Sequence, residues 1–278
     1  MRWNGRSWVV RVLQGSVALC LLGVLVPRVI AAAAETPGDI SAPAVGGADL
    51  HGHQRAGLSK LQHLVVMMQE NRSYDSYFGY LPVFGQGNAT LEPQTGNPDP
   101  TATSLQVVPF HQTATCTTAD LAHGWTAVHQ EIDGGRMDGF TTANVDPTDP
   151  TGSRALGYYT PRELPFYYAL ANAFGVGDRY FASVPGPTFP NRYYLLAGTS
   201  FGHVDNALPP AGGWTQKTIF QELDAAGVSW RVYFAQVPFA GLFSYVQQHQ
   251  AGHLEPITQY YSDAAAGTLP QVTFIDPI

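Results

Sequence analysis

The 278-residue chain is long enough for one or two domains with their own hydrophobic cores. Only 13% of its residues are charged and 12% are aromatic, which argues against an intrinsically disordered chain. The net charge of −7 disfavours general electrostatic binding to nucleic acids or to anionic membranes, because both repel an acidic protein.

The N-terminal segment predicts export. A basic start is followed by an apolar run from Val12 to Val26 and by four alanines at 31–34. This is the layout of a secretory signal peptide, and the run is shorter than the roughly 20 residues that span a bilayer. We therefore expect residues 1–34 to be cleaved and the protein to be secreted or held in the cell envelope. Residues 35–60 predict a flexible linker, and 61–278 the folded domain.

Strands and helices alternate along this domain. The apolar run at 64–68 predicts a strand buried on both faces of a parallel sheet. Further strands are predicted at 176–181, 228–233 and 271–275. Helices are predicted at 119–131, 164–173, 190–197 and 215–226, with Thr215 capping the last. The alternation indicates an α/β fold with a mostly parallel sheet, in which ligands bind beyond the carboxyl ends of the strands.

Glu70 and Asn71 follow the first predicted strand and offer a carboxylate and an amide oxygen. A strand end would orient both groups, and oxygen ligands suit a hard divalent cation. The alternative is that Asn71 caps the next helix while Glu70 is solvated. The pair alone leaves both interpretations open.

Thr188 lies in the turn 185–192, which opens a predicted helix. Backbone N–H groups at a helix start can bind phosphate, and their field favours an ionised hydroxyl. A threonine hydroxyl needs activation to act as a nucleophile, and metal coordination is one route. The alternative is a helix cap, a position in which threonine is common.

His123 and His129 are six residues apart, a spacing that does not place both on one helix face. An imidazole could hold a phosphate oxygen or serve the leaving group. A structural role is the alternative for each histidine.

A series of motifs in a fixed order resembles the bacterial phosphoesterase family, which includes phospholipases C and certain acid phosphatases. The blocks are Leu64–Gly79, Asp120–Trp125, Gly134–Phe140, Tyr158–Pro165, Asp178–Phe181 and Gly186–Arg192. The resemblance extends from about residue 61 to the last residue.

The resemblance implies an alkaline-phosphatase-like fold, which is a three-layer α/β/α sandwich with a mostly parallel sheet. It implies Glu70, Asn71 and Thr188 as metal ligands, Thr188 also as the nucleophile, and His123 as a phosphate contact. The cation would be a hard divalent ion of the Ca, Mg or Mn type, its identity left open. In the implied mechanism, metal-activated Thr188 attacks phosphorus in line and water then hydrolyses the phospho-enzyme.

The family places further metal ligands, including an Asp pair, and further histidines beyond the position of the last residue. The segment 269–277 resembles the family strand that precedes this region. We therefore expect the 278-residue chain to be a C-terminally truncated product, with little or no activity by itself.

The function expected from the resemblance is hydrolysis of phospholipid head groups by a phospholipase C-type phosphodiesterase. An acid phosphatase acting on monoesters and an inactive exported binding protein are the alternatives. Tyrosine pairs at 158–159, 167–168 and 193–194 could receive a choline group, although core packing is the commoner role. The expected partners are a phosphate ester and, at most transiently, a membrane surface, with no nucleic acid. The oligomeric state is left open.

Overall fold

The computed structural model describes residues 60–69, 72–85, 87, 96–102, 104–117 and 119–277. The predicted signal peptide, nearly all of the predicted linker, and both Glu70 and Asn71 lie outside the described residues.

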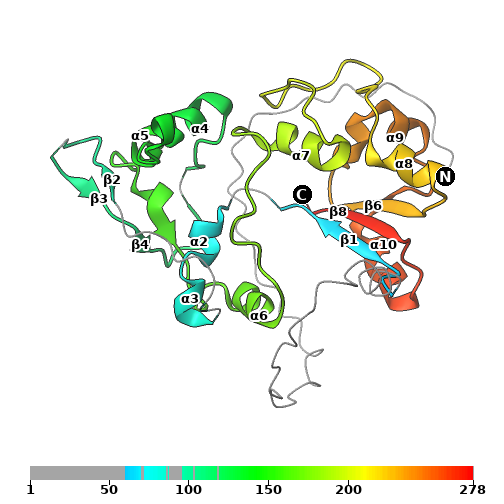
Figure 1. Ribbon diagram of the computed structural model, residues 1–278, viewed down its shortest axis with the longest axis horizontal. Helices are drawn as coiled ribbons and strands as arrows, with labels where there is room; N and C mark the ends of the chain where they lie inside the picture. The colour runs from blue at the N-terminus through cyan, green and yellow to red at the C-terminus, as the bar shows by residue number, and fades with distance from the viewer. Residues whose placement is uncertain are drawn as a thin grey trace, which may run out of the picture.

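A parallel sheet forms the centre of the C-terminal part of the structure (Figure 1). Its four strands lie in the order β1 (Leu64–Met67), β8 (Val272–Asp276), β6 (Trp230–Phe234) and β7 (Leu254–Pro256). All three pairings are parallel, with β1 and β6 on either side of β8. The predicted α/β fold with a mostly parallel sheet is thus confirmed. The specific alkaline-phosphatase-like sandwich stays a prediction.

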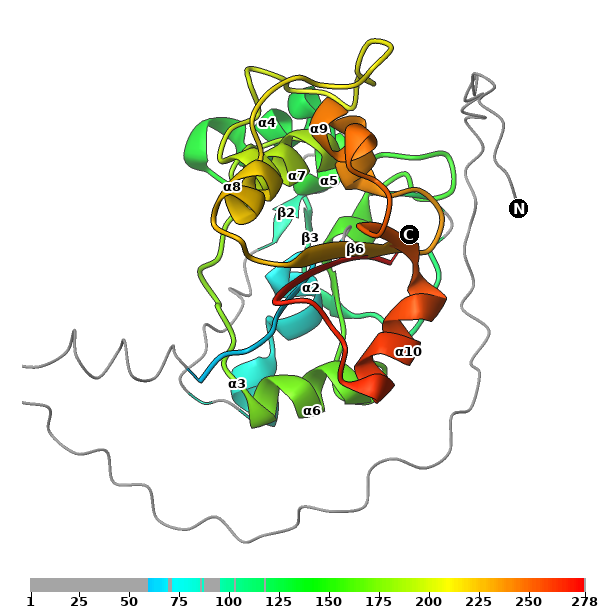
Figure 2. The same cartoon turned by 90° about the vertical axis from the view of Figure 1, so that its right-hand side faces the viewer.

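Helices cover both faces of this sheet, as Figure 2 shows. On one face lie α7 (Thr188–Ala197), α8 (Ile219–Ala225) and α9 (Ser244–Gln248), and on the other lies α10 (Ile257–Ala266). Alternate strand residues serve the two faces: Val232 and Phe274 join Phe220 of α8 in the main core. Tyr233 points the other way and donates to Asp263 of α10 over 2.6 Å. Burying each large apolar side chain of the core contributes about 1.5–3 kcal/mol.

A second group of short elements lies to one side of the sheet in Figure 1. Its helices are α2 (Tyr74–Phe78), α3 (Leu81–Phe84), α4 (Trp125–Ile132), α5 (Phe140–Ala143) and α6 (Pro165–Ala173). Its strands are β2 (Asn97–Pro98), β3 (Gln106–Val107), β4 (Phe110–His111) and β5 (Gly157–Tyr158). Single 3₁₀ turns occur at Asp133–Gly135 and Ser153–Leu156 here, and at Phe239–Leu242 near the sheet. A small core forms around Leu81, Tyr168 and Ala171. Within the described residues, no helix is long and apolar enough to cross a bilayer.

Arg192 joins α7 to the ends of two strands. One of its guanidinium nitrogens lies 3.0 Å from the Asp276 carboxylate at the end of β8, and the other donates to the Met68 carbonyl just after β1 over 3.1 Å. The second Asp276 oxygen accepts from the backbone N–H of Phe239. Because Arg192 and Asp276 are both buried, this ion pair fixes the helix against the carboxyl end of the sheet.

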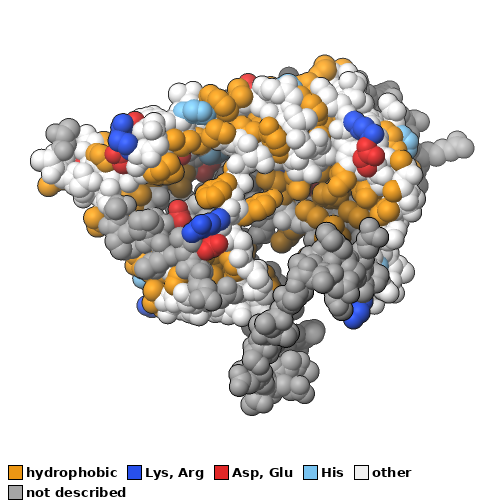
Figure 3. Space-filling view, viewed as in Figure 1, with side chains coloured by type: hydrophobic (Ala, Val, Ile, Leu, Met, Phe, Trp, Pro, Cys, Tyr) orange, Lys and Arg blue, Asp and Glu red, His pale blue; other side chains and the backbone are white. Residues whose placement is uncertain are grey.

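The exposure of β1 contradicts one prediction. Leu64 and Met67 are 55% and 53% exposed, so this strand is not buried on both faces. Its described sheet neighbour is β8 alone, and Figure 3 shows apolar side chains gathered over this part of the molecule. A continuous apolar run predicts a strand but does not determine the strand's place in the sheet.

Two elements in the first half of the domain were predicted wrongly. The helix expected over 119–131 begins only at Trp125, because the Ala122 N–H donates to the Asn144 side chain instead of to a helix carbonyl. Residues 176–181 form a loop with a turn rather than a strand.

Two helices in the second half start at other residues than expected. Helix α7 begins at Thr188, which places Pro190 in its first turn but not at its first position. Helix α8 is capped by Thr218, whose capping box with Gln221 satisfies the helix start, and the expected cap Thr215 lies outside the helix.

The remaining predicted elements agree with the structure. The helix at 164–173 and the strands at 228–233 and 271–275 begin and end within two residues of their predicted positions. The segment between β6 and β8 carries α9, β7 and α10, none of which was predicted.

We expect Arg192→Met to lower the free energy of unfolding by about 3–5 kcal/mol, because it leaves the buried Asp276 carboxylate without its cation. Urea unfolding followed by tryptophan fluorescence measures the change. The matched control is Lys217→Met, which breaks an exposed ion pair with Glu222 and should cost at most about 1 kcal/mol. Equal losses in the two variants would contradict the role given to Arg192.

Candidate functional site

Thr188 is the first residue of α7. Pro187 occupies the cap position, so the alternative that Thr188 caps this helix is wrong. The preceding turn is held by the Asn191 side chain, whose amide bonds both backbone groups of Val184 and the carbonyls of Gly186 and Pro187. These contacts fix the direction in which the chain enters α7 and therefore the position of the threonine.

The start of α7 offers fewer anion-binding groups than the sequence suggested. The N–H of Phe189 donates to the Asn206 side chain over 2.9 Å, and Pro190 has no N–H. Two of the first three helix positions therefore cannot bind a phosphate through the backbone, which corrects that part of the prediction.

Thr188 lies on the helix face that meets the end of β1. It precedes Arg192 by one helical turn, and residues four apart share a helix face. Since Arg192 donates to the Met68 carbonyl, this face is directed at the segment that leads into Glu70 and Asn71. The structure thus brings together the segments that flank the predicted metal ligands.

Ser73, rather than Asn71, caps the helix that follows β1. Its hydroxyl accepts the N–H of Ser76 over 3.2 Å at the start of α2. The alternative explanation for Asn71, that it serves as this cap, is therefore wrong. The positions of the Glu70 and Asn71 side chains lie outside the described residues.

His123 lies in the loop before α4, with its side chain 42% exposed. Its Nδ1 donates to the Leu121 carbonyl over 2.7 Å, which leaves Nε2 to face a ligand. The Asp120 carboxylate lies 3.8 Å from Nδ1. His129 differs, because its Nδ1 bonds the Trp125 carbonyl within α4 and its ring packs on that indole. The structure thus supports the structural alternative for His129.

The loops that carry His123 and Thr188 touch through Trp125 and Gly186. A Cβ atom placed on Gly186 would lie 3.4 Å from the Trp125 indole, so the ring packs directly over the glycine backbone. His123 is two residues before Trp125, and Thr188 is two residues after Gly186.

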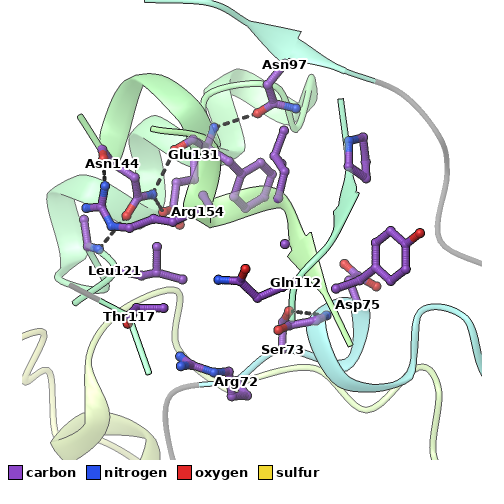
Figure 4. A pocket seen from close by; sticks show the side chains of 18 of the residues that line it. Arg72, Ser73, Asp75, Asn97, Gln112, Thr117, Leu121, Glu131, Asn144 and Arg154 are labelled. Carbon is purple, nitrogen blue, oxygen red and sulfur yellow. Dashed lines mark hydrogen bonds between the residues drawn. The ribbon is translucent and has the colours of Figure 1, made fainter. Parts of the chain in front are cut away.

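A cavity of about 330 Å³ opens beside His123, a volume at the lower end of the range for small-molecule sites (Figure 4). It lies between the start of α2, the loop before α4, α5 and β5. His123 and Arg72 line it, and Arg72 directly follows the predicted ligands at 70–71. Thr188 does not line this cavity. Sequence reasoning missed the cavity, because its walls come from segments that are far apart in the chain.

Asn144 is the central polar residue of the cavity wall and is only 2% exposed. Its side-chain oxygen accepts the N–H of Ala122, next to His123, over 2.7 Å. Its amide nitrogen donates to the Glu131 carboxylate over 2.9 Å and to the Phe140 carbonyl over 2.8 Å. Burial raises the pKa of the Glu131 carboxyl, and the Asn144 bond and the nearby His123 oppose that rise. No signal in the sequence pointed to Asn144 or Glu131 as site residues.

Glu163 holds the strand pair β4 and β5 that supports the cavity. Its carboxylate accepts from His111 Nε2 over 2.9 Å and from both the N–H and the hydroxyl of Thr160. The bond from His111 is the largest of the effects that lower the pKa of Glu163 to about 2, from an ordinary value near 4.5.

The sequence was compared with protein families and with individual known proteins. The sequence model of the Phosphoesterase family matches residues 61–278. Non-hemolytic phospholipase C of Pseudomonas aeruginosa is 30% identical over 98% of the chain and 41% of its own length. Non-specific phospholipase C6 of Arabidopsis thaliana is 33% identical over 79% of the chain and 44% of its own length. Phospholipase C B of Mycobacterium tuberculosis is 33% identical over 70% of the chain and 42% of its own length. The chain therefore spans about two fifths of the length of these relatives.

We expect Asn144→Ala to lower the free energy of unfolding by about 1–3 kcal/mol, because it leaves the partly buried N–H of Ala122 and carbonyl of Phe140 without the Asn144 side chain as a partner. Thr142→Ala, at an exposed position in α5 two residues before Asn144, is the control and should change stability by at most about 0.5 kcal/mol. Thermal unfolding monitored by circular dichroism compares the two. If Asn144→Ala lowers stability no more than the control does, the structural role given to Asn144 in the cavity wall is wrong.

We expect Glu163→Gln to destabilise the protein above pH 5 but not near pH 2. A carboxyl with a lowered pKa contributes stability that is present above its unfolded pKa and is lost as the pH falls through its folded pKa. The difference in stability between the unmodified protein and the variant should therefore shrink between pH 4.5 and about 2. Urea unfolding at a series of pH values measures it, and a difference independent of pH would contradict the Glu163–His111 contact.

Proposed function

Because the chain belongs to the Phosphoesterase family, we propose that it is a phosphoric ester hydrolase of the phospholipase C type. The observation that carries the proposal is the contact of Arg192 with the Met68 carbonyl, which turns the Thr188 face of α7 toward the segment after β1. In this proposal the fold is the alkaline-phosphatase-like sandwich, and the protein is exported by its N-terminal segment.

Thr188 is the nucleophile in the proposed reaction. Its oxygen forms a bond to phosphorus while the bond from phosphorus to the leaving alcohol breaks, and the alcohol departs with a proton. The phosphate bound to Thr188 still carries the head group. Water then attacks this phosphorus and breaks its bond to the threonine oxygen, which releases the phosphorylated head group and restores the hydroxyl. The turn held by Asn191 positions Thr188 for both steps.

His123 contacts the phosphate. Its Nδ1 is engaged by the Leu121 carbonyl, so Nε2 is the nitrogen that meets a phosphate oxygen or the leaving group. Trp125 holds this loop against the loop that enters α7.

A hard divalent cation fits the donors proposed for the site. Glu70, Asn71 and Thr188 would supply a carboxylate, an amide oxygen and a hydroxyl, which are the ligands that such ions prefer. The Arg192 contact supports this grouping, since it holds the ends of the two segments together. Among the described residues, no group of three or more His, Cys, Asp or Glu could hold a metal ion. When bound, the cation would lower the pKa of the Thr188 hydroxyl.

The proposed substrates are phospholipids, as the names of the related phospholipases C suggest. Hydrolysis of phosphomonoesters by the same residues is the alternative. A non-catalytic exported binding protein would bind a phosphate ester or a metal ion without turnover.

We expect Thr188→Ala to lower turnover of a chromogenic phosphodiester by about a thousandfold or more, because the variant lacks the attacking oxygen. Thr188→Ser should retain part of the activity. The control is Thr215→Ala, an exposed threonine away from the site, which should leave turnover unchanged. Assays with added Ca²⁺, Mg²⁺ or Mn²⁺, and with a chelator, test the cation.

The substrate comparison separates the three interpretations. Faster turnover of bis(p-nitrophenyl) phosphate than of p-nitrophenyl phosphate supports the diesterase, and the reverse order supports the phosphatase. If the Thr188→Ala variant keeps its turnover, Thr188 is not the nucleophile. Binding of inorganic phosphate or a metal ion with no turnover of either ester supports the binding protein.

A further inference from the structure

The loop that joins α7 to α8 returns to the start of α7. It lies on the same side of the sheet as α7, as Figures 1 and 2 show. The side-chain oxygen of Asn206 in this loop accepts the backbone N–H of Phe189 over 2.9 Å. Phe189 is the second residue of α7 and directly follows Thr188. A residue 17 positions after Phe189 in the chain thus contacts the backbone beside the proposed nucleophile.

Two asparagine side chains hold the peptide groups on either side of Thr188. Asn191 donates to the Pro187 carbonyl over 3.1 Å, and this carbonyl belongs to the peptide group before the threonine. Asn206 accepts the N–H of Phe189, which belongs to the peptide group after it. Because each peptide group is planar, the two bonds together restrict φ and ψ of Thr188. Its χ1 is then the remaining torsion that decides where the side-chain oxygen lies.

The loop that carries Asn206 is fastened to α7 itself. The His203 ring packs on the Trp214 indole, with 4.5 Å between the ring centroids. Trp214 in turn donates its indole N–H to the Tyr193 hydroxyl over 3.0 Å, and Tyr193 is a buried residue of α7. These contacts hold both sides of Asn206 against the helix whose start it binds.

A neutral amide suits the position of Asn206. Its oxygen accepts the N–H of Phe189 without placing a negative charge beside the proposed phosphate site. A carboxylate could accept the same N–H, but it would repel a phosphate ester that approaches Thr188. An alanine would leave the peptide group after Thr188 without this contact.

We infer that Asn206 is a positioning residue for the proposed nucleophile. It holds the peptide group after Thr188, so that the threonine oxygen stays in line with the bond that breaks. The inference rests on the proposed function, because it gives Asn206 a part in the same reaction. Asn206 acts through the backbone of Phe189 and touches neither the phosphate nor the leaving group.

Steady-state kinetics with bis(p-nitrophenyl) phosphate test the positioning. We expect Asn206→Ala to lower kcat by about 10- to 100-fold with KM unchanged within about threefold, because the attacking group is misplaced while binding remains. Asn206→Asp keeps the acceptor, so it should restore kcat to within about threefold while its charge raises KM by about threefold or more. The control Asn172→Ala makes the same substitution at an exposed position of α6 and should change neither constant.

Nuclear magnetic resonance of the isotope-labelled chain reads the contact without any turnover. In Asn206→Ala, the amide proton of Phe189 should exchange with solvent about tenfold faster, because its hydrogen bond is lost. The Cα and Cβ resonances of Thr188 should shift as its backbone relaxes, whereas those of Leu196 in the same helix should not. Asn206→Asp should retain both the slow exchange and the resonances of the unmodified protein.

The outcomes separate this inference from the proposed function. Unchanged kcat in Asn206→Ala, in a protein whose turnover requires Thr188, would overturn the inference alone. A loss of kcat in Asn206→Asp as large as that in Asn206→Ala would also overturn it, as would unchanged Thr188 resonances in Asn206→Ala. Turnover that persists in Thr188→Ala would reject the proposed function, and shifted Thr188 resonances would then still support Asn206 as the residue that sets the Thr188 backbone.

Discussion

The buried ion pair between Arg192 and Asp276 is the interaction on which the rest of the structure depends. It is formed by a residue in the middle of α7 and by the last residue of β8, and the same guanidinium also holds the carbonyl that follows β1. A buried pair is weak evidence for extra stability, but it determines position, since each misplaced arrangement would leave a charge without its partner. Thr188 is oriented by this constraint, because it lies one turn away on the same helix.

The group of short elements beside the sheet is organised by hydrogen bonds more than by a large core. Its buried apolar cluster is small, whereas Asn144 alone bonds residues of the loop before α4, of α4 and of α5. Buried amide and carboxylate groups need hydrogen-bond partners, and a satisfied network of this kind is rigid. The network around Asn144 forms part of the cavity wall. In the proposed function, the sheet and α7 position Thr188, and the hydrogen-bonded group supplies the cavity beside His123.

Local sequence patterns predicted several elements of the chain better than they predicted how those elements pack. The strands at 228–233 and 271–275 follow from local apolar runs, and the motif around Thr188 follows from the resemblance to phosphoesterases. The exposure of β1 could not be predicted, because position in a sheet depends on residues more than 200 positions away. The false helix start at 119 has a similar cause, since Asn144 takes the N–H of Ala122 from another element. Glu131 and Asn144 carry no motif, and their importance follows only from the cavity around them.

The central claim is that the end of β1 and the first residue of α7 share one cation site, and a crystal structure grown with Ca²⁺ tests it most directly. We predict one ion with the Glu70 carboxylate, the Asn71 amide oxygen and the Thr188 hydroxyl all within about 2.6 Å of it. An ion bound elsewhere, or a Glu70 carboxylate on the far side of the Arg192 side chain from Thr188, would contradict the account.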